Sequence, residues 1–223
     1  MNLPKKEDIL DFSHTVAAPL FENTNQIFEV LPKIKNFISE LGASLPKDEF
    51  SELADEVFVA KDANISKNAT IEGPAIIGHK AEIRPGAYIR GSVIIGNGAV
   101  IGNSTEVKNA IIFDLAQLPH YNYVGDSVLG YKSHLGAGAV ISNFKLDHTD
   151  VKVRQGDETL ETGLRKFGAI IGDYTEIGCG SVIFPGTIIG RNTMVYPLTP
   201  VRGVIQENSI VRSENTLNII PKK

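Results

Sequence analysis

A six-residue spacing of apolar residues dominates this sequence from Val59 onward. Ten consecutive positions of one run keep it: Val59, Ile65, Ile71, Ile77, Ile83, Ile89, Ile95, Ile101, Val107 and Phe113. Two further runs follow: Tyr123, Leu129, Leu135 and Ile141, then Ile171, Ile177, Ile183, Ile189, Val195 and Val201. A helix repeats at about 3.6 residues and a strand at about 2, so neither element alone explains a period of six.

A short strand followed by a turn does explain this period. Three such units close one triangular coil of a parallel β-helix, with aliphatic residues stacked inside and Gly, Asn or Asp at the corners. Each coil rises by one strand spacing, about 4.8 Å, so the twenty units predict six to seven coils and roughly 30 Å of prism. We therefore predict an all-β fold, a left-handed parallel β-helix of hexapeptide repeats, over residues 56–213.

Residues 1–55 lack the spacing and predict a small α-helical appendage. The stretch VLPKIKNFISELGASLP has apolar residues at helical spacing, with Pro32 near its start and Gly42 at its end. The stretch KDEFSELADEV predicts a second short helix. Such an appendage would either cap the open first coil or mediate oligomerisation, and both interpretations stay open. Residues 214–223 are expected to form a C-terminal tail.

Two segments, near 114–122 and 144–168, interrupt the spacing and predict loop insertions. Phe113 and Tyr123 are ten residues apart, and Ile141 and Ile171 are thirty apart. The second segment is polar and has a hairpin signal at Gln155-Gly156-Asp157. Loops that leave a rigid scaffold are where function concentrates, and the contents of the first segment favour a functional role. The second segment is equally explained as a tolerated surface insertion.

The composition narrows the class of protein. The net charge is −4, which does not suggest bulk nucleic-acid binding or a polybasic membrane contact. Cys179 is the one cysteine, so no internal disulfide forms and a reducing compartment is the simpler interpretation. The N-terminus lacks the apolar core of a signal peptide, and no apolar run reaches the ~18 residues of a membrane span. We expect a soluble, cytoplasmic protein.

His120 is the histidine that we single out, because it lies in the first interruption, between Pro119 and Tyr121. An imidazole accepts a proton near neutral pH, and acyl transfer to an amine requires such a base. A zinc site is the alternative, since γ-class carbonic anhydrases share this fold and have two histidines four residues apart. Here the nearest pair, His120 and His134, is fourteen residues apart, and one cysteine gives no thiolate site. We expect no metal.

Arg90 and Lys108 suggest an anion site. They follow the inward Ile89 and Val107 and are 18 residues apart, which is one coil. Their side chains would leave the same face about 5 Å apart, where a phosphate between them would relieve the repulsion. Alternatively, Glu82 or Glu106 neutralises the column.

The stretch HYNYVGDSVLGYKSHLGAGAVISNF closely resembles the acetyltransferase domain of bifunctional glucosamine-1-phosphate acetyltransferase/N-acetylglucosamine-1-phosphate uridylyltransferases. It resembles still more the archaeal and bacterial sugar-1-phosphate nucleotidyltransferases that carry such a domain, as does TGLRKFGAIIGDYTEIGCGSVIFPGTIIG. The resemblance runs from about residue 75 to 212. It implies an acetyl-CoA-dependent N-acetyltransferase that acts on an amino-sugar 1-phosphate such as glucosamine 1-phosphate, and a homotrimer with coenzyme A sites between adjacent prisms.

The resemblance also implies roles for individual residues. His120 matches the catalytic base. Tyr123 and Asn143 match residues that hold the sugar phosphate, and Lys108 matches the phosphate-binding lysine. Spacing makes Arg90 its partner, whereas a local RPG motif points to Arg84. Arg212 resembles an arginine that contacts coenzyme A, and Cys179 is included as a second candidate for that contact, although as a small wall residue it would have no role.

The sequence departs from the family at three places. His134 stands where the family usually has Asn, and Phe144 where the bifunctional enzymes have Tyr, which leaves the acceptor sugar open. Residues 1–55 are too short for the family's nucleotidyltransferase domain and lack its Gly-rich loop, so we do not expect nucleotidyltransferase activity. Two alternatives to an acetyltransferase remain: a non-catalytic sugar-nucleotide-binding or regulatory subunit that partners a nucleotidyltransferase, and a γ-carbonic-anhydrase-like metal enzyme.

Overall fold

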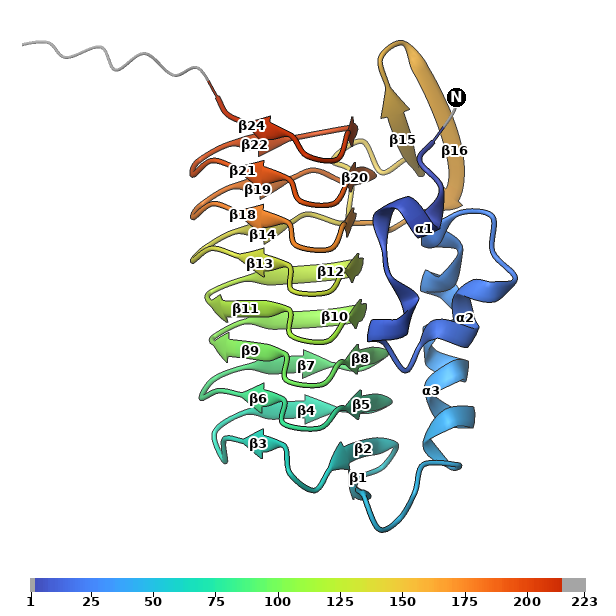
Figure 1. The fold of residues 1–223 in the computed structure, drawn as a ribbon, viewed down its shortest axis with the longest axis vertical. Helices are drawn as coiled ribbons and strands as arrows, with labels where there is room; N and C mark the ends of the chain where they lie inside the picture. Colours follow the sequence, from blue (N-terminus) through green and yellow to red (C-terminus); the bar gives the residue numbers. More distant parts are fainter. Residues whose placement is uncertain (1–2, 214–223) are drawn as a thin grey trace, which may run out of the picture.

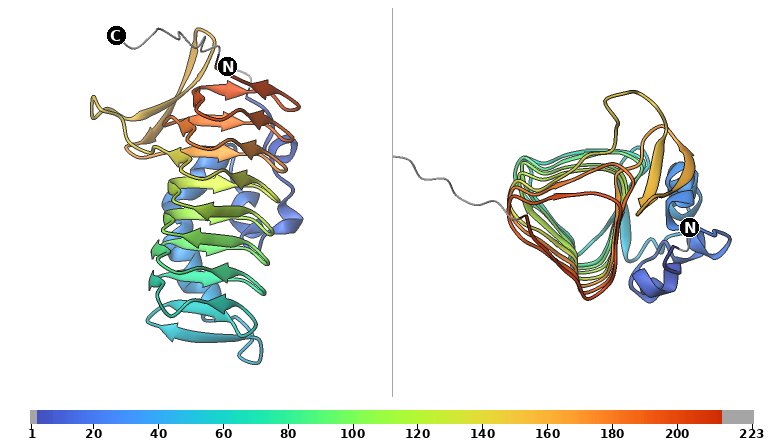
Figure 2. Two further views of the ribbon diagram at one scale, coloured as in Figure 1. Left: turned by 90° about the vertical axis from the view of Figure 1, so that its left-hand side faces the viewer. Right: turned by 90° about the horizontal axis from the view of Figure 1, so that it is seen from above.

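The computed structural model describes residues 3–213, which form a prism of stacked parallel strands with helices along one side (Figure 1). Seen along its axis, the prism has a triangular outline (Figure 2). Every strand pair within the prism wall is parallel and joins consecutive coils, as in the register Ile77↔Ile95. The left-handed β-helix predicted from the six-residue spacing is confirmed.

The strands lie on three faces, which we name after one of their strands. The β3 face is an eight-stranded sheet of β3 (Asn64–Ile65), β6 (Glu82–Ile83), β9 (Val100–Asn103), β11 (Gln117–His120), β13 (His134–Leu135), β18 (Glu176–Ile177), β21 (Met194–Val195) and β24 (Ile210–Val211). The β4 face holds β4 (Thr70–Glu72), β7 (Tyr88–Arg90), β14 (Val140–Ile141), β19 (Val182–Ile183) and β22 (Pro200–Val201). The β5 face holds β2 (Val57–Ala60), β5 (Ala75–Ile77), β8 (Val93–Ile95), β17 (Ala169–Ile171), β20 (Thr187–Ile189) and β23 (Val204–Ile205).

Two longer strands, β10 (Glu106–Ile112) and β12 (Tyr123–Leu129), pass from the β4 face to the β5 face. Each turns the corner at a single residue with positive φ, Asn109 (φ 46°) in β10 and Asp126 (φ 48°) in β12. The preceding coil uses two such residues, Gly91 and Ser92, at the same corner. The single-residue corners shorten two repeat units from six residues to five.

These shortened units explain why the predicted loop at 114–122 is wrong. The segment contains β11, which pairs with β9 and β13 in the wall. From the end of β10 onward, the inward aliphatic residues are Ile112, Leu118 and Val124. Phe113 faces outward against the helices, and Tyr123 is also on the outer surface of the wall. The β3 face therefore has eight levels, more than the six to seven coils predicted from the spacing.

The N-terminal helices lie along the β5 face. They are α1 (Lys6–Ile9), the 3-10 helix η1 (Phe12–His14), α2 (Ala18–Glu22), the 3-10 helix η2 (Ile27–Lys33) and α3 (Ile34–Gly42). They bury the outward aliphatic residues of that face, Ile76, Ile94, Ile111, Val128, Ile170 and Ile188, in a second core. The helix expected around Pro32 and Gly42 is present, but the layer runs along the prism rather than over its end (Figure 1).

The predicted second helix, KDEFSELADEV, is wrong. Its residues form β1 (Phe50–Ala54), which pairs antiparallel with β2. The first strand of a β-helix has an unpaired edge, and a strand that covers this edge gains backbone hydrogen bonds that a helix would not supply. It is therefore β1, not a helix, that protects the start of the prism.

The segment 144–168 leaves the wall and ends in a hairpin, as its Gln155-Gly156-Asp157 signal predicts. The hairpin consists of β15 (Val151–Gln155) and β16 (Glu158–Leu164), with Gly156 at positive φ in its turn. Val151 and Val153 are fully buried against the second core, so the hairpin extends the helical cover to the last coils (Figure 2).

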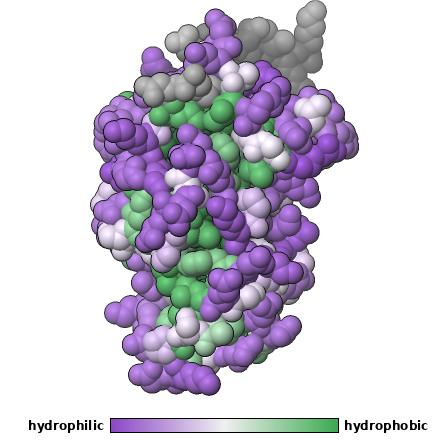
Figure 3. All heavy atoms as spheres, turned by 90° about the vertical axis from the view of Figure 1, so that its right-hand side faces the viewer, coloured by the Kyte–Doolittle hydropathy of each residue, from purple (hydrophilic) through white to green (hydrophobic). Residues whose placement is uncertain are grey.

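Figure 3 views this covered side, where apolar side chains remain visible between polar ones along the length of the molecule. Asp173 joins the layer to the prism, because its carboxylate accepts hydrogen bonds from the backbone N–H groups of Asp11 (2.7 Å) and Tyr131 (2.8 Å). Within residues 3–213, no helix combines the length and apolar character needed to cross a bilayer.

Candidate active site

His120 lies at the end of β11, on the corner between the β3 and β4 faces, with its side chain exposed. Its backbone is fixed, because its N–H donates to Asn122 Oδ1 (3.2 Å) and its carbonyl accepts from the Gly138 N–H (3.0 Å). Across residues 3–213, the imidazole makes no hydrogen bond or ion pair. The structure thus fixes the backbone of His120 and leaves both ring nitrogens available to a ligand.

Asn122 is the residue that fixes this corner, and sequence reasoning did not single it out. Its side chain is 3% exposed and donates to the carbonyls of Gly136 (2.9 Å) and Ala139 (3.2 Å) in the next coil. Most coils have a small residue two positions before the inward aliphatic, as with Ala99 before Ile101. An asparagine at this position, before Val124, is a signal that could have identified it.

A polar cluster occupies the corner where the β4 face meets the β5 face. The carboxylate of Asp126, 6% exposed, lies at its centre. Asn109 Nδ2 donates to Asp126 Oδ1 (2.8 Å), and Asn143 Nδ2 donates to Asp126 Oδ2. Lys108 Nζ lies 3.9 Å from the same Oδ2. Asp126 therefore connects side chains from three consecutive coils, and sequence reasoning missed it.

Tyr123 extends from the β4 face toward this cluster, where its hydroxyl and Asn143 Nδ2 both lie next to Gly125. Burial raises the pKa of Tyr123 above its ordinary value, and the nearby carboxylates of Glu106 and Asp126 raise it further. The phenol therefore keeps its proton to a higher pH than an ordinary tyrosine.

Arg90 and Lys108 occupy equivalent places on adjacent coils, as their spacing predicts, since Ile89 pairs with Val107. Neither cation is free, however. Arg90 Nη1 lies 2.6 Å from Glu106 Oε1, and this hydrogen bond raises the pKa of Arg90. Lys108 faces Asp126. The alternative that Glu106 neutralises the column is what the structure shows for Arg90.

The remaining predicted residues lie elsewhere on the prism. Arg84, on the β3 face, forms two 3.1 Å hydrogen bonds with Glu82. His134, also on the β3 face, has Nδ1 2.8 Å from Glu176 Oε2. Arg212 is exposed just after β24.

Cys179 is exposed and shares its corner with His120. Successive backbone hydrogen bonds follow this corner from coil to coil, from Gly138 N to His120 O and from Gly180 N to Ala137 O. Cys179 therefore lies about two strand spacings from His120 along the prism. The structure brings Arg90, Lys108, Tyr123 and Asn143 together on one face, with His120 and Cys179 along the corner of that face.

A metal site was the alternative considered for the histidines. In the described part of the chain, no group of three His, Cys, Asp or Glu side chains is placed to hold a metal ion. His79 has two carboxylate neighbours, Asp62 (2.9 Å) and Glu49 (3.3 Å), but these contacts join β1 to the first coils.

Residues 71–159 match the family described as the GMPPB C-terminal domain. The chain is 39% identical over 92 residues to a bifunctional sugar-1-phosphate nucleotidylyltransferase/acetyltransferase of Sulfurisphaera tokodaii, covering 41% of this chain and 23% of that protein. It is 32% identical over 119 residues to the bifunctional protein GlmU of Methanococcus maripaludis, covering 53% of this chain and 29% of that protein.

The chain thus matches less than a third of the length of these two relatives. The resemblance found in the sequence is confirmed, because the homologues of this chain are bifunctional sugar-1-phosphate nucleotidyltransferase/acetyltransferases. Solved structures with a related fold include AntD, an N-acyltransferase from Bacillus cereus, with a TM-score of 0.39, 18% identity and coverage of 75% of this chain and 81% of that one. Another is the acetyltransferase domain of PglB from Neisseria gonorrhoeae, with a TM-score of 0.32, 17% identity and coverage of 81% and 63%.

Proposed function

We propose that this protein is an acetyl-CoA-dependent N-acetyltransferase that acts on an amino-sugar 1-phosphate, with His120 as the general base. The observation that carries the proposal is the exposed imidazole of His120, which has no polar partner among residues 3–213 and stands on a backbone that the buried Asn122 fixes. The matched region contains both His120 and Asn122, and the Sulfurisphaera tokodaii relative is named as an acetyltransferase.

The chemistry follows from the groups that are present. His120 accepts a proton from the acceptor amine as the nitrogen attacks the thioester carbonyl and forms the new C–N bond. The C–S bond then breaks, and the departing sulfur takes up a proton to leave a free thiol. Tyr123 and Asn143 orient the sugar through their hydrogen-bonding groups. Backbone N–H groups of the corner stabilise the oxyanion of the tetrahedral intermediate.

Coenzyme A lies, in this proposal, along the corner that runs from His120 to Cys179, with Arg212 further along the prism. The sequence favours Arg90 and Lys108 as the residues that bind the phosphate of the acceptor. A phosphate there has to displace the carboxylates of Glu106 and Asp126, which hold these cations in the free protein. His134 and Arg84 face away on the β3 face and would reach the acceptor only from a neighbouring prism.

A free-thiol assay across amino-sugar 1-phosphates, beginning with glucosamine 1-phosphate, tests the proposal. We expect thiol release that needs both substrates and that His120→Ala abolishes. Calorimetric binding of acetyl-CoA to both proteins would show that the variant keeps its donor site. If no acceptor yields thiol while the protein binds sugar nucleotides, the non-catalytic alternative replaces this proposal.

A further inference from the structure

A cavity of about 500 Å³ lies immediately beyond the candidate active site, toward the C-terminal end of the prism. One wall is the segment that starts at Ser142, next to Asn143, and the opposite wall is formed by the coils of β19 and β22. Strand β15 closes the third side. The side chains that define its chemistry are Phe144, Lys145, Lys152, Arg154, Phe184 and Arg202. Four of these six are cations, whereas Asp147 is the one carboxylate in the lining.

Close backbone contacts with two glycines of the coils fix the position of β15. Gly186 and Gly203 form successive corners, with φ of +79° and +84°. A methyl group on Gly186 would collide with the carbonyl oxygen of Lys152, and one on Gly203 would lie 2.8 Å from that of Arg154. Because Val151 and Val153 point into the core, the alternation of the strand turns Lys152 and Arg154 outward at the cavity. These two cations are thus placed by rigid backbone contacts.

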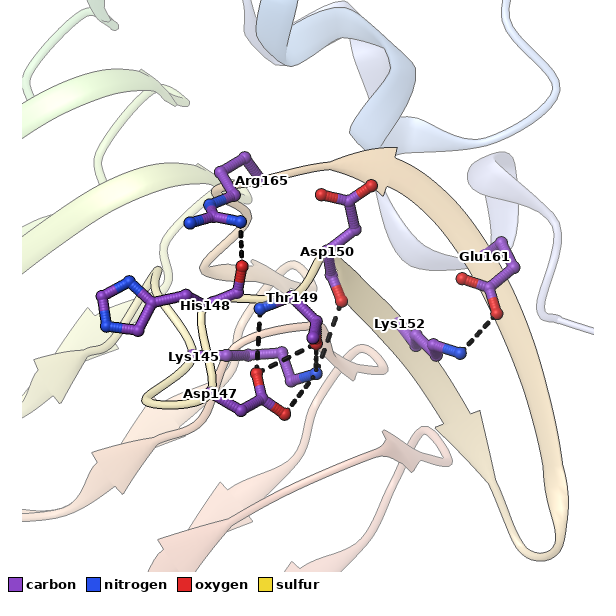
Figure 4. A network of polar contacts seen from close by, with 8 residues as sticks. All are labelled: Lys145, Asp147, His148, Thr149, Asp150, Lys152, Glu161 and Arg165. Atoms are coloured by element: carbon purple, nitrogen blue, oxygen red, sulfur yellow. Dashed lines mark hydrogen bonds and ion pairs between the residues drawn. The ribbon is translucent and has the colours of Figure 1, made fainter.

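The four cations differ in their partners. Lys145 contacts Asp147 (3.1 Å) and Thr149, and Lys152 pairs with Glu161, as Figure 4 shows. Arg154 and Arg202, by contrast, have no carboxylate partner among residues 3–213. The Arg202 guanidinium lies 4.5 Å from the centre of the Phe184 ring, which holds it against an apolar floor.

This distribution is the opposite of that at Arg90 and Lys108. There the sequence predicted a phosphate because two cations stood together, but carboxylates hold both. In the cavity, two arginines without a carboxylate partner among residues 3–213 stand beside the rings of Phe144 and Phe184. Arginine is well suited to phosphate because its planar guanidinium donates two parallel hydrogen bonds.

We propose that this cavity binds a phosphate or diphosphate ester, with Arg154 and Arg202 on the anion and Phe184 beneath its organic part. A further step rests on the proposed function: the ligand is a phosphate or diphosphate group of one of its two substrates. Two sources offer this chemistry, the 1-phosphate of the acceptor and the diphosphate of coenzyme A. Both are small-molecule phosphate esters.

Calorimetric titration of the whole chain with inorganic pyrophosphate, glucosamine 1-phosphate and coenzyme A tests the site directly. We expect Arg154→Gln and Arg202→Gln each to weaken pyrophosphate binding about tenfold, the loss of one charge-assisted hydrogen bond. Lys67→Gln is the matched control, since it removes one exposed cation at a distant corner of the first coils and should change nothing.

The two esters then identify the source. A tenfold loss confined to glucosamine 1-phosphate assigns the cavity to the acceptor, and one confined to coenzyme A assigns it to the donor. Pyrophosphate that does not bind, or that binds equally to wild type, Arg154→Gln and Arg202→Gln, overturns the site. Binding is measured without turnover, so a functioning cavity in a protein that releases no thiol would count against the proposed function alone.

Discussion

At the scale of single residues, His120 differs from His79 and His134, because its imidazole has no carboxylate partner among residues 3–213. His79 lies between Asp62 and Glu49, and His134 faces Glu176. A general base contributes about 10²–10⁴-fold to rate. We therefore expect His120→Ala to lower kcat by that factor and to leave the KM for acetyl-CoA nearly unchanged. His79→Ala is the control, and an equal loss of kcat in both variants would contradict the assignment.

Tyr123 leads to a prediction about alkaline pH. Its pKa is raised in the folded protein, so the neutral phenol contributes stability that is fully present below the ordinary pKa of 10.0 and is lost as pH rises through the folded value. Spectrophotometric titration of tyrosinate should show one fewer late-ionising tyrosine in Tyr123→Phe. The subtraction is needed because Tyr88 also has a raised pKa, through its hydrogen bond to Glu72. A difference curve centred at or below 10 would refute the prediction.

The sequence indicated which residues to consider as site candidates, but it did not indicate which carboxylates would contact the cations among them. His120, Tyr123 and Asn143 stand out through an unusual motif, which local sequence reveals. Glu106 and Asp126 neutralise cations on neighbouring coils, sixteen and eighteen residues away from Arg90 and Lys108. Which carboxylate reaches which cation depends on rotamers and on the shortened corners, and neither can be obtained from spacing alone.

At the scale of elements, the β5 face has an apolar surface on both sides. Ile94 points outward to the helices and Ile95 points into the prism, and both are essentially fully buried. Truncating a buried isoleucine costs about 2–5 kcal/mol. We expect Ile94→Ala to lower the free energy of unfolding in urea by as much as Ile95→Ala. A loss below about 1 kcal/mol for Ile94→Ala alone would show that the helices do not stay on this face.

The docking of the hairpin gives a second element-scale prediction. Gly186 and Gly156 both have positive φ, where a side chain costs about 1–2 kcal/mol. Only at Gly186 would a methyl group also meet the backbone of β15, since nothing lies within 4 Å at Gly156. Gly186→Ala should therefore expose β15 to hydrogen exchange and proteolysis, whereas Gly156→Ala should lower stability slightly and leave the hairpin docked. Equal protection in both variants would count against this account.

The sequence predicts repeating elements well and connections poorly. Stacked strands with aliphatic cores impose a period, so the prism could be recognised from Val59 to Val201. Corners constrain the sequence less, because one residue such as Asn109 can replace the two residues of an ordinary corner. The positions of the inward residues then shift by one, and no apolar residue signals the change. The strand β1 was mistaken for a helix because its neighbour, the open edge of the first coil, is a tertiary feature.

At the scale of the whole molecule, the helices and the hairpin cover one of the three faces, which leaves the β3 and β4 faces and their shared corner for contacts with other copies. Apolar side chains gather on the C-terminal coils there: Met194 is 47% exposed, Tyr196 44% and Leu198 71%. Leu198 lies on the corner that also carries His120 and Cys179, since its N–H donates to the Cys179 carbonyl. We propose a homotrimer built through this region.

Rotational symmetry makes each copy use the same patch, so one charge introduced into it acts three times in a trimer. Sedimentation equilibrium should give three times the chain mass of 24.1 kDa for wild type and a shift toward monomer for Leu198→Glu. Leu53→Glu, at a residue 61% exposed in β1 at the opposite end of the prism, should leave the mass unchanged. If coenzyme A lies between adjacent copies, thiol release by Leu198→Glu should fall on dilution along with the trimer. A monomeric wild type with full activity would remove the need for a shared site and confine all of the chemistry to one prism.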